Sequence, residues 1–488
     1  MATIPFGTWR PDQPALGNTA LVARNVRPAE SSYLPFPNFN PVSTSLNARC
    51  QGAIAVQDAA GNTYNYVGET ANLRVLNGNS WSAVTSGSGS YTTADSDFWE
   101  FVQWGQTIIG VNGLTDQPQQ ISIGAAAFAG LAGAPPKARH ICVNRDFVVL
   151  GNVSDSATGV TRVRWSAINN PTSWTVDAAT LADYQDLYTE HGEIRRLVGG
   201  IDYGLVFQSR AIIRQTFVGS PLAFRFDPIR VNLGLYAPQA LCVHDNLVFF
   251  LSEDGFYQFD GAQAIPIGKG HVDRYFFANL DQQYVGRIVA VTEPTNKLAI
   301  FAYPATGSQG QLTRLLVYSW VYQKWAEVTG MALDYVYRAL TTGVTLDGLD
   351  AYFASLDTVT PPLDDRYWQG GNVALAGVAV RRLGFFNGPT LPAVLETGEI
   401  SPTAPQLAHT TWVRPFVEGA GSLSVTVAVR NRLDESVSWL TAVSPLSSGD
   451  CPVRATARYQ RFRVSIAASA NWEHAVGVDI TTSPAGMR

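Results

Sequence analysis

Charged residues are scarce in this chain. Asp, Glu, Lys and Arg make up 15% of its 488 residues, whereas a typical globular domain has about 25%. Lysine is almost absent, with four residues against 30 arginines, and the net charge is −5. This composition excludes a coiled coil, a disordered acidic chain and a basic nucleic-acid-binding arm. Any contact with DNA must therefore occur without overall electrostatic attraction.

Cysteine pairs and long apolar runs are also missing. Cys50, Cys142, Cys242 and Cys451 lie far apart in the sequence and form no CxxC motif, so we expect four reduced and mostly buried thiols. The first residues lack the basic and apolar regions of a signal peptide, and the most apolar stretch, 124–136, is too short to span a bilayer. We therefore expect no membrane anchor, and synthesis and folding in a reducing cytoplasm.

Groupings that would indicate catalysis are absent from the sequence. No two of the six histidines fall at a metal-ligand spacing such as HxH or HxxxH. Gly199-Gly200 has no following GK[ST] or GxGxxG frame, so it does not indicate a phosphate-binding loop. The segment Ser252–Tyr257 resembles the Asp-box of sialidases, but its Asp-Gly pair is more typical of a hairpin turn. We expect no catalytic, cofactor or metal site and no enzymatic activity.

Aromatic and apolar residues, by contrast, are plentiful. Aromatic residues form 11% of the chain and hydrophobic residues 46%, which is enough to bury a large core. The length predicts two or three packing units, or one long repeat architecture.

The first 47 residues have the composition of an extended arm. Seven prolines in the first 41 residues predict that neither a helix nor a central strand can run through this segment: Pro5, Pro11, Pro14, Pro28, Pro35, Pro37 and Pro41. The arm is too aromatic to be a solvated linker. We expect Trp9, Arg10, Phe36 and Phe39 to lie at an interface with another domain or a neighbouring subunit.

Residues 48–390 show short β-rich runs at close spacing, separated by turn signals. A weak repeat of about 40 to 50 residues combines paired apolar strands with a hairpin that ends near an aromatic residue. Small repeated sheets of this kind predict a β-propeller, because neighbouring blades must cover the faces of each sheet. Starts near residues 50, 97, 139, 192, 238 and 285 predict about six blades. The stretch 331–390 is less regular and could belong to the last blade, form a seventh, or be an insertion.

Residues 391–488 change to longer strands with strict alternation, which predicts an appended β-sandwich-like platform domain. In the strand expected at 458–466, Phe462 and Val464 point to one face, while Arg461 and Arg463 point to the other. We assign these two arginines to pairing between subunits or domains rather than to DNA phosphates. The fold class expected for the whole chain is all-β.

Several stretches, in order along the chain, resemble the nozzle proteins of short-tailed bacteriophages, also called tail tubular protein B or packaged-DNA stabilisation protein. The stretches are 101–112 with 116–119, 164–168 with Trp174, 192–195 through 213–221, 250–257 with Gly261, and 458–463 ahead of Gly477-Val478. Trp9-Arg-Pro11 and the Pro-rich arm also look like the start of that family.

The resemblance implies a structural subunit of the virion tail that forms a homohexameric ring below the portal and adaptor. Such a ring would retain packaged DNA and conduct it during ejection, with double-stranded DNA present only in transit. The implied partners are the tail adaptor and fibre, spike or needle proteins, and the family offers no catalytic residues. A second possibility is a glycan-binding or glycan-cleaving β-propeller of a tail adhesin, which an exposed cleft with paired carboxylates and tryptophans would favour.

Overall fold

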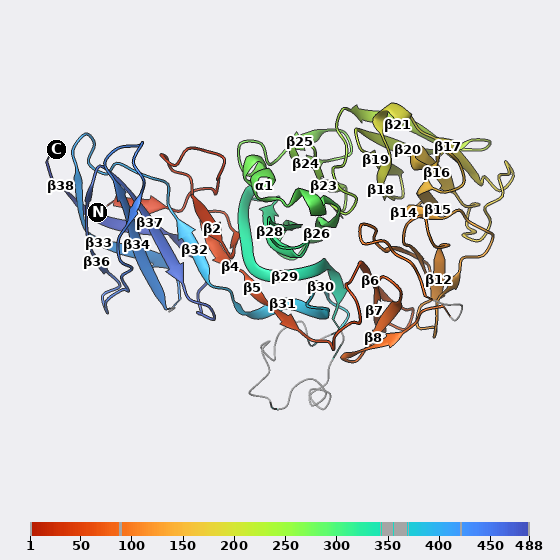
Figure 1. Cartoon of the computed structure of the whole chain (residues 1–488), viewed down its shortest axis with the longest axis horizontal. Helices are drawn as coiled ribbons and strands as arrows, with labels where there is room; N and C mark the ends of the chain where they lie inside the picture. Colours follow the sequence, from red (N-terminus) through yellow and green to blue (C-terminus); the bar gives the residue numbers. More distant parts are fainter. Residues whose placement is uncertain are drawn as a thin grey trace.

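The structure is a computed structural model that describes residues 2–86, 90–341, 343, 355, 368, 370–419 and 422–486. The protein is all-β and is built from many small antiparallel sheets (Figure 1). The described residues contain one α-helix, α1 (Asp273–Asn279), and short 3-10 turns at Gly159–Thr161, Thr189–His191 and Gln282–Arg287. None of the helices in this part of the chain is long and apolar enough to cross a membrane.

Three four-stranded sheets follow the arm, and in each the strands pair in chain order. The first contains β6 (Gly52–Gln57), β7 (Thr63–Gly68), β8 (Leu73–Asn77) and β9 (Ser80–Ala83). The second contains β10 (Glu100–Trp104), β11 (Thr107–Val111), β12 (Gln119–Ser122) and β13 (Ala129–Gly130). The third contains β14 (Ala138–Asn144), β15 (Phe147–Val153), β16 (Arg162–Trp165) and β17 (Asp183–Asp186).

Three further groups of four strands repeat this arrangement. They are β18 (Ile194–Val198), β19 (Tyr203–Gln208), β20 (Ala211–Gly219) and β21 (Ala223–Val231); β22 (Leu241–His244), β23 (Leu247–Ser252), β24 (Gly255–Phe259) and β25 (Ala264–Pro266); and β26 (Val289–Glu293), β27 (Leu298–Pro304), β28 (Leu312–Ser319) and β29 (Lys324–Leu340). The groups start where the sequence repeat places its starts. Ser252–Tyr257 forms the β23–β24 hairpin.

The first strands of successive groups lie beside one another. Contacts join β6 to β10, β10 to β14, β14 to β18, β22 to β26, β26 to β29, and β29 back to β6. The neighbouring strand β7 also contacts β29: the side chain of Asn65 donates to the carbonyl of Leu340 at 3.1 Å and accepts from its N–H at 3.3 Å. Apolar side chains fill the spaces between neighbouring sheets, so each sheet is covered by the next.

Strand β29 is 17 residues long and pairs with two different strands along its length. Its first half pairs with β28, and its second half pairs with β30 (Val373–Ala379). Strand β30 continues to β31 (Arg382–Thr390), whose outer edge pairs with β5 (Pro37–Pro41) of the N-terminal arm. In the stretch 331–390 that the sequence left open, most of the described residues therefore lie in β29, β30 and β31, and most of 342–369 lies outside the described residues.

A strand of the N-terminal arm lies inside a large sheet, which corrects the expectation from its prolines. Strand β2 (Val22–Arg24) pairs in parallel with β29 and antiparallel with β32 (Ala393–Glu396). It occupies a proline-free interval between Pro14 and Pro28, so nothing in its backbone prevents pairing on both edges. The sheet continues from β32 through β37 (Tyr459–Ile466) and β34 (Leu423–Arg430) to β35 (Ser438–Trp439), giving twelve strands in all.

A second sheet completes the C-terminal part of the molecule. It contains β33 (Ala408–Val417), β36 (Cys451–Ala457) and β38 (Ala475–Pro484), together with the arm strands β1 (Ala2–Pro5), β3 (Val26–Pro28) and β4 (Tyr33–Pro35). The arm is thus docked on the C-terminal part of its own chain. This sheet shares one hydrophobic core with β32, β34 and β37. The alternation predicted along β37 is confirmed, with Phe462 and Val464 buried.

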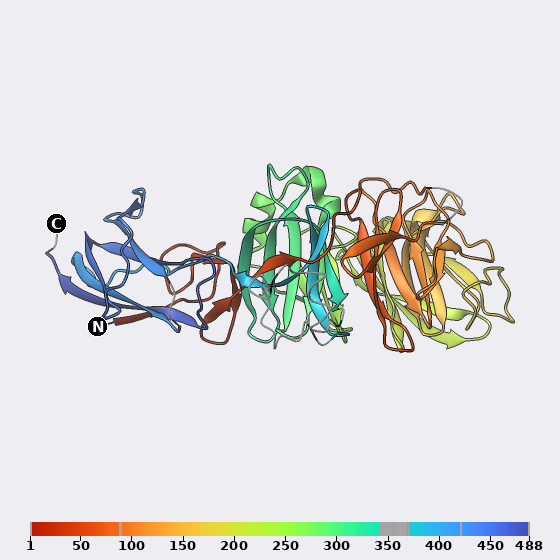
Figure 2. The ribbon, with the colours of Figure 1, turned by 90° about the horizontal axis from the view of Figure 1, so that it is seen from below.

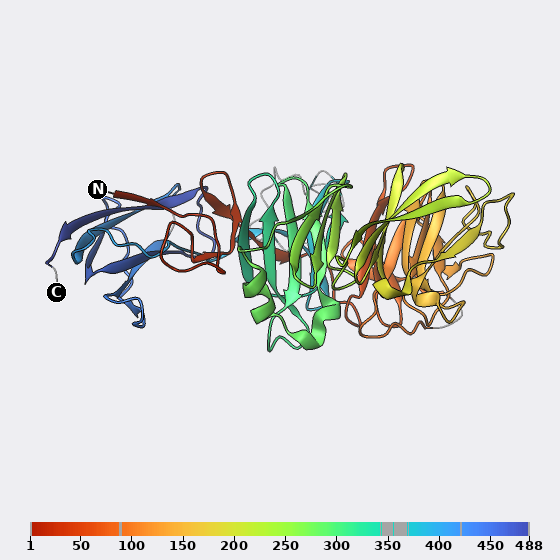
Figure 3. The same cartoon turned by 90° about the horizontal axis from the view of Figure 1, so that it is seen from above.

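The molecule is elongated, and the C-terminal sheets lie at one end of its long axis (Figures 2 and 3). Next come α1 and the strands around β26–β29, and the sheets between β6 and β21 form the other end. All four cysteines are free and buried, as the sequence predicts.

Candidate functional site

The first strands of the small sheets bring polar side chains together at the point where those strands meet. Glu100 begins β10, His140 lies on β14 and Arg196 lies on β18. Two-residue turns follow β10 and β14, and Gly105, at φ 57°, opens the turn between β10 and β11. The sequence therefore sets one polar residue on each of three adjacent inner strands.

Glu100 is the centre of this cluster. Its Oε1 accepts hydrogen bonds from His140 Nδ1 at 2.9 Å, Arg196 Nη1 at 2.7 Å and Gln239 Nε2 at 3.0 Å. Its Oε2 faces the backbone N–H of Ile141 at 3.4 Å. Gln239 belongs to the segment that leads into β22, so four successive sheets are joined through one carboxylate.

Burial and charge act in opposite directions on this carboxylate. Glu100 is 5% exposed, and burial alone would raise its pKa by disfavouring the charged form. The charge of Arg196 and the hydrogen bond from His140 outweigh burial, so the pKa of Glu100 is lowered and the group is ionised at neutral pH. Tyr335 of β29 extends the cluster, because its hydroxyl donates to Gln239 Oε1 at 3.4 Å.

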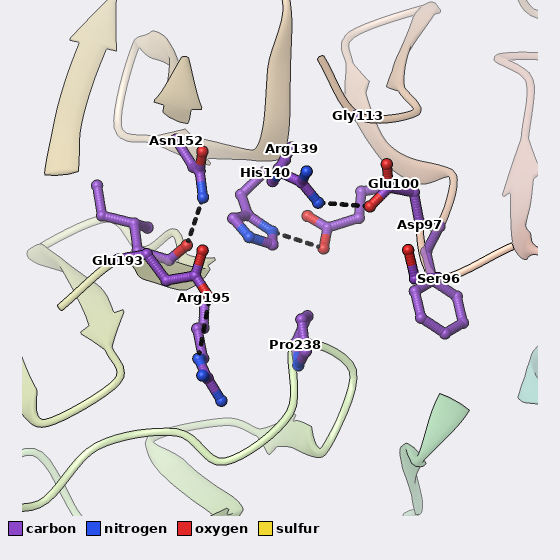
Figure 4. Close-up of a pocket in the computed structure, with 12 residues that line it drawn as sticks. Ser96, Asp97, Glu100, Gly113, Arg139, His140, Asn152, Glu193, Arg195 and Pro238 are labelled. Atoms are coloured by element: carbon purple, nitrogen blue, oxygen red, sulfur yellow. Dashed lines mark hydrogen bonds and ion pairs between the residues drawn. The ribbon is translucent and has the colours of Figure 1, made fainter. Parts of the chain in front are cut away.

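A small pocket borders the cluster on the side of Asp97 and Arg195 (Figure 4). Arg139 Nη1 pairs with Asp97 Oδ1 at 2.5 Å, and the Asn152 amide donates to the carbonyl of Ile194 at 3.2 Å. The cavity measures about 50 Å³, which holds a few water molecules but no organic substrate. The three donors to the Glu100 carboxylate come from β14, β18 and the segment that leads into β22, so the cluster holds the sheets of these strands together.

The aromatic residues of the arm, which we predicted to lie at an interface, pack against other parts of the same chain. Trp9 is 2% exposed, donates from Nε1 to the carbonyl of Leu21 at 3.2 Å, and meets the ring of Tyr275 edge-on at 5.4 Å. Phe36 and Phe39 both contact the ring of Phe386, with centroids 5.9 and 5.7 Å away. These rings fix the arm to α1 and to β31.

Arg10 lies beside Trp9 but makes a different kind of contact. Its backbone N–H donates to the carbonyl of Ala20 at 3.3 Å. Burial lowers the pKa of His271, and the nearby charge of Arg10 lowers it further. Arg10 therefore lies near the loop that precedes α1, and the arm covers this loop. Next to it, Asp12 accepts from the N–H groups of Arg274 and Tyr275 in the first turn of α1.

Arg461 and Arg463 find their partner in the adjacent strand. Arg461 Nη1 lies 3.1 Å from Glu396 Oε1, and Arg463 Nη2 lies 2.7 Å from Glu396 Oε2. The guanidinium of Arg463 also stacks 3.8 Å from the ring centre of Trp439. We predicted that these arginines pair between subunits or domains, whereas their pairs with Glu396 lie within the C-terminal sheets of one chain.

Sequence reasoning missed the residues that complete these contacts. Glu100, Tyr275, Phe386 and Glu396 each stand alone in the sequence, without a spacing that would link them to their partners. The structure brings Phe36 and Phe39 together, and Arg461 and Arg463 together, but leaves Trp9 and Arg10 in a separate contact. In the sequence, the only signal that could have marked Glu100 is that a carboxylate interrupts a predicted strand.

The chain matches no protein-family model and no curated protein. Among solved structures it is similar to the extracellular domain of a putative one component system from B. thetaiotaomicron, with 12% identity and a TM-score of 0.42 over 83% of this chain. The chain covers 47% of that domain. AztD from Citrobacter koseri (12% identity, TM-score 0.32, 61% of this chain and 94% of that one) and the WD40 domain of Neurospora crassa Pan2 (7%, 0.37, 65% and 91%) are also similar.

Proposed function

We propose that the small sheets form a β-propeller and that the C-terminal sheets form a β-sandwich platform. Six blades would start at β6, β10, β14, β18, β22 and β26, and a seventh would consist of the second half of β29 with β30, β31 and β5. The contact of β29 with β6 and the cluster around Glu100 support this arrangement, because neighbouring blades must cover one another.

We propose further that the chain is a structural subunit of a bacteriophage tail nozzle, without catalytic activity. The observation that carries this proposal is the twelve-stranded sheet that runs through the joint between the two parts of the molecule. Two domains connected by a linker move relative to each other by default, whereas shared strand pairing makes this molecule one stiff body. Stiffness suits a subunit that must hold its place in a ring under load.

The distribution of exposed apolar side chains supports assembly into a ring. One set lies on the C-terminal sheets and their loops: Trp412, Leu433, Trp439, Leu446 and Val476. Another lies on the sheets from β14 to β21 and their loops: Tyr184, Tyr188, Ile201, Val218 and Leu222. A cyclic oligomer is closed by contacts between two different surfaces of each subunit, and a stiff body with apolar residues at both ends provides them. The proposed hexamer would meet the adaptor and the fibre, spike or needle proteins in the virion.

The proposal is tested by locating and counting the chain in virions. An antibody against the chain should label the tail below the portal, and imaging of intact tails should show six copies per ring. Native mass measurement of the isolated ring should give six times the 52.8 kDa of one chain. A tail with one or three copies per ring, or labelling confined to a peripheral fibre, would contradict the nozzle assignment and favour the adhesin.

A further inference from the structure

A larger cavity lies away from the central cluster, at the end of the β26–β27 turn. It measures about 320 Å³ and is bounded by that turn, the end of β29, the start of β30, and β31. This volume falls in the range of small-molecule sites, which begins at about 300 Å³. The side chains that give the cavity its chemistry are Arg338, Asn387, Glu293, Asn296, Thr292 and Phe386.

Arg338 supplies a positive charge that no carboxylate among the described residues pairs with. It lies on β29 between the buried residues Tyr337 and Ala339, and its own side chain is exposed. Its backbone pairs with β30, but in the described part of the chain the guanidinium of Arg338 takes part in no hydrogen bond or ion pair. A free guanidinium on a cavity wall can bind a carboxylate or phosphate through two parallel N–H donors.

Asn387 supplies an amide that lacks partners although it is buried. Both Nδ2 and Oδ1 are shielded from solvent and form no hydrogen bond in the protein. An unsatisfied buried donor or acceptor costs about 1–3 kcal/mol, and such groups in native structures require an explanation. A ligand with hydroxyl groups would satisfy both atoms, because a hydroxyl can accept from Nδ2 and donate to Oδ1.

The one carboxylate among the described residues that line the cavity does not neutralise Arg338. Glu293 Oε1 accepts from Asn296 Nδ2 at 2.5 Å, and Asn296 Oδ1 accepts in turn from Arg27. Glu293 is thus held by partners other than Arg338, and the guanidinium of Arg338 remains available to a ligand in the cavity.

From these contacts we infer that the cavity binds a carboxylate that carries neighbouring hydroxyl groups. Arg338 would pair with the carboxylate, Asn387 would exchange hydrogen bonds with the hydroxyls, and Phe386 would cover an apolar face of the ligand. This chemistry belongs to the uronic acid units of acidic polysaccharides and also to free hydroxy acids. The inference concerns binding alone and does not depend on the nozzle assignment.

Calorimetric titration of the full chain would test this inference with three probes: D-glucuronate, trigalacturonate and tartrate. D-Glucose, which lacks the carboxylate, is the matched control ligand. We expect D-glucuronate to bind and D-glucose to bind at least tenfold more weakly. Tighter binding of trigalacturonate would identify a polysaccharide as the source, and tighter binding of tartrate a free hydroxy acid.

Substitutions separate this site from nonspecific binding. Arg338→Ala should weaken glucuronate binding at least tenfold, with Arg338→Lys intermediate because a lysine provides charge without the fork. Asn387→Ala should weaken it severalfold. Arg382→Ala, which removes an exposed arginine at the start of β31 that does not line the cavity, is the control and should bind as the parent does. An unchanged melting temperature would show that each variant is folded.

The inference is overturned if none of the three probes binds at about 10 mM, which corresponds to a free energy weaker than about −3 kcal/mol. It is equally overturned if Arg338→Ala and Arg382→Ala bind glucuronate alike. Neither result would affect the copy number or position of the chain in a tail.

Discussion

At the scale of single residues, the carboxylate of Glu100 joins four sheets whose sequences are far apart. Its Oε1 is shared by donors from β14, β18 and the segment before β22. Removing one member of a buried charged group leaves the others uncompensated, which typically costs about 3–5 kcal/mol. The stability of the assembled sheets should therefore depend on this one side chain.

Glu100→Gln should lower the free energy of unfolding by about 3 kcal/mol or more, because Arg196 would lose its countercharge and His140 its charged acceptor. Equilibrium urea denaturation measures the change. Glu193→Gln is the matched control, since Glu193 lies on the rim of the same pocket, is half exposed, and pairs with Arg195 at 3.5 Å. That variant should change stability by less than about 1 kcal/mol. Equal losses in the two variants would contradict the central role of Glu100.

A second carboxylate, Asp273 at the start of α1, is buried with less compensation. Burial raises its pKa to about 7, and the nearby carboxylates of Asp12 and Asp254 add to the effect. Its Oδ1 accepts from the N–H of Phe256 at 3.1 Å. Because the folded protein holds this proton more tightly than the unfolded chain does, its contribution to stability is present at low pH and is lost as the pH rises from about 4 to 7.

Asp273→Asn should remove this pH dependence. We expect the variant to be more stable than the parent by about 1–3 kcal/mol at pH 8 and to differ little at pH 4. Urea denaturation at both pH values measures the difference. Asp202→Asn, at an exposed loop position, should leave the parent's pH dependence intact. A gain for Asp273→Asn that is the same at pH 4 and pH 8 would refute the ionisation of Asp273 as its cause.

At the scale of elements, the sequence predicted the small sheets better than it predicted the arm. Short strands and turn residues repeat locally, so the starts of the six strand groups could be read from the chain itself. The pairing of β2 with β29 and β32 depends on residues about 300 positions away, which local patterns do not encode. The proline count described the arm correctly as extended but did not reveal that its proline-free interval is a central strand.

Local sequence patterns also did not reveal the partners of the residues predicted at interfaces. Arg461 and Arg463 were recognised from strict alternation along one strand, and the structure confirms the alternation. Their partner, Glu396, comes from β32, which lies beside β37 only after folding. Strand periodicity therefore predicted which face these arginines occupy but not what they bind.

Trp9→Ala should loosen the N-terminal arm. Loss of this buried ring removes the edge-on contact with Tyr275 and the hydrogen bond to Leu21, and such truncations typically cost about 3–5 kcal/mol. Hydrogen exchange in residues 2–28 should become faster while the sheets from β6 to β21 stay protected. Leu16→Ala, at a side chain that is 48% exposed, is the control and should exchange like the parent. Unchanged protection in Trp9→Ala would show that the arm is held by its strand pairing alone.

At the scale of the whole molecule, charge predicts weak contact with DNA. The chain carries a net charge of −5, and many of its arginines are engaged by carboxylates of the same chain. Nonspecific DNA binding requires several free cations to neutralise phosphates. A surface of this kind would let a duplex pass without strong friction.

Purified protein should therefore give no gel shift with duplex DNA at physiological salt. Lowering the salt concentration should produce at most a weak shift, because few counterions would be released. A basic DNA-binding protein of known affinity serves as the positive control. A dissociation constant below about 1 µM with a steep salt dependence would contradict the expected passive contact.

The place of β2 inside the twelve-stranded sheet sets an order for the synthesis of the chain. Residues 22–24 leave the ribosome early, but their partner Glu327 is added about 300 residues later, which takes about 15–60 s at 5–20 residues per second. Strand β32, its other partner, follows later still. Throughout that time β2 has no sheet to join, so its pairing must form after most of the chain has been made.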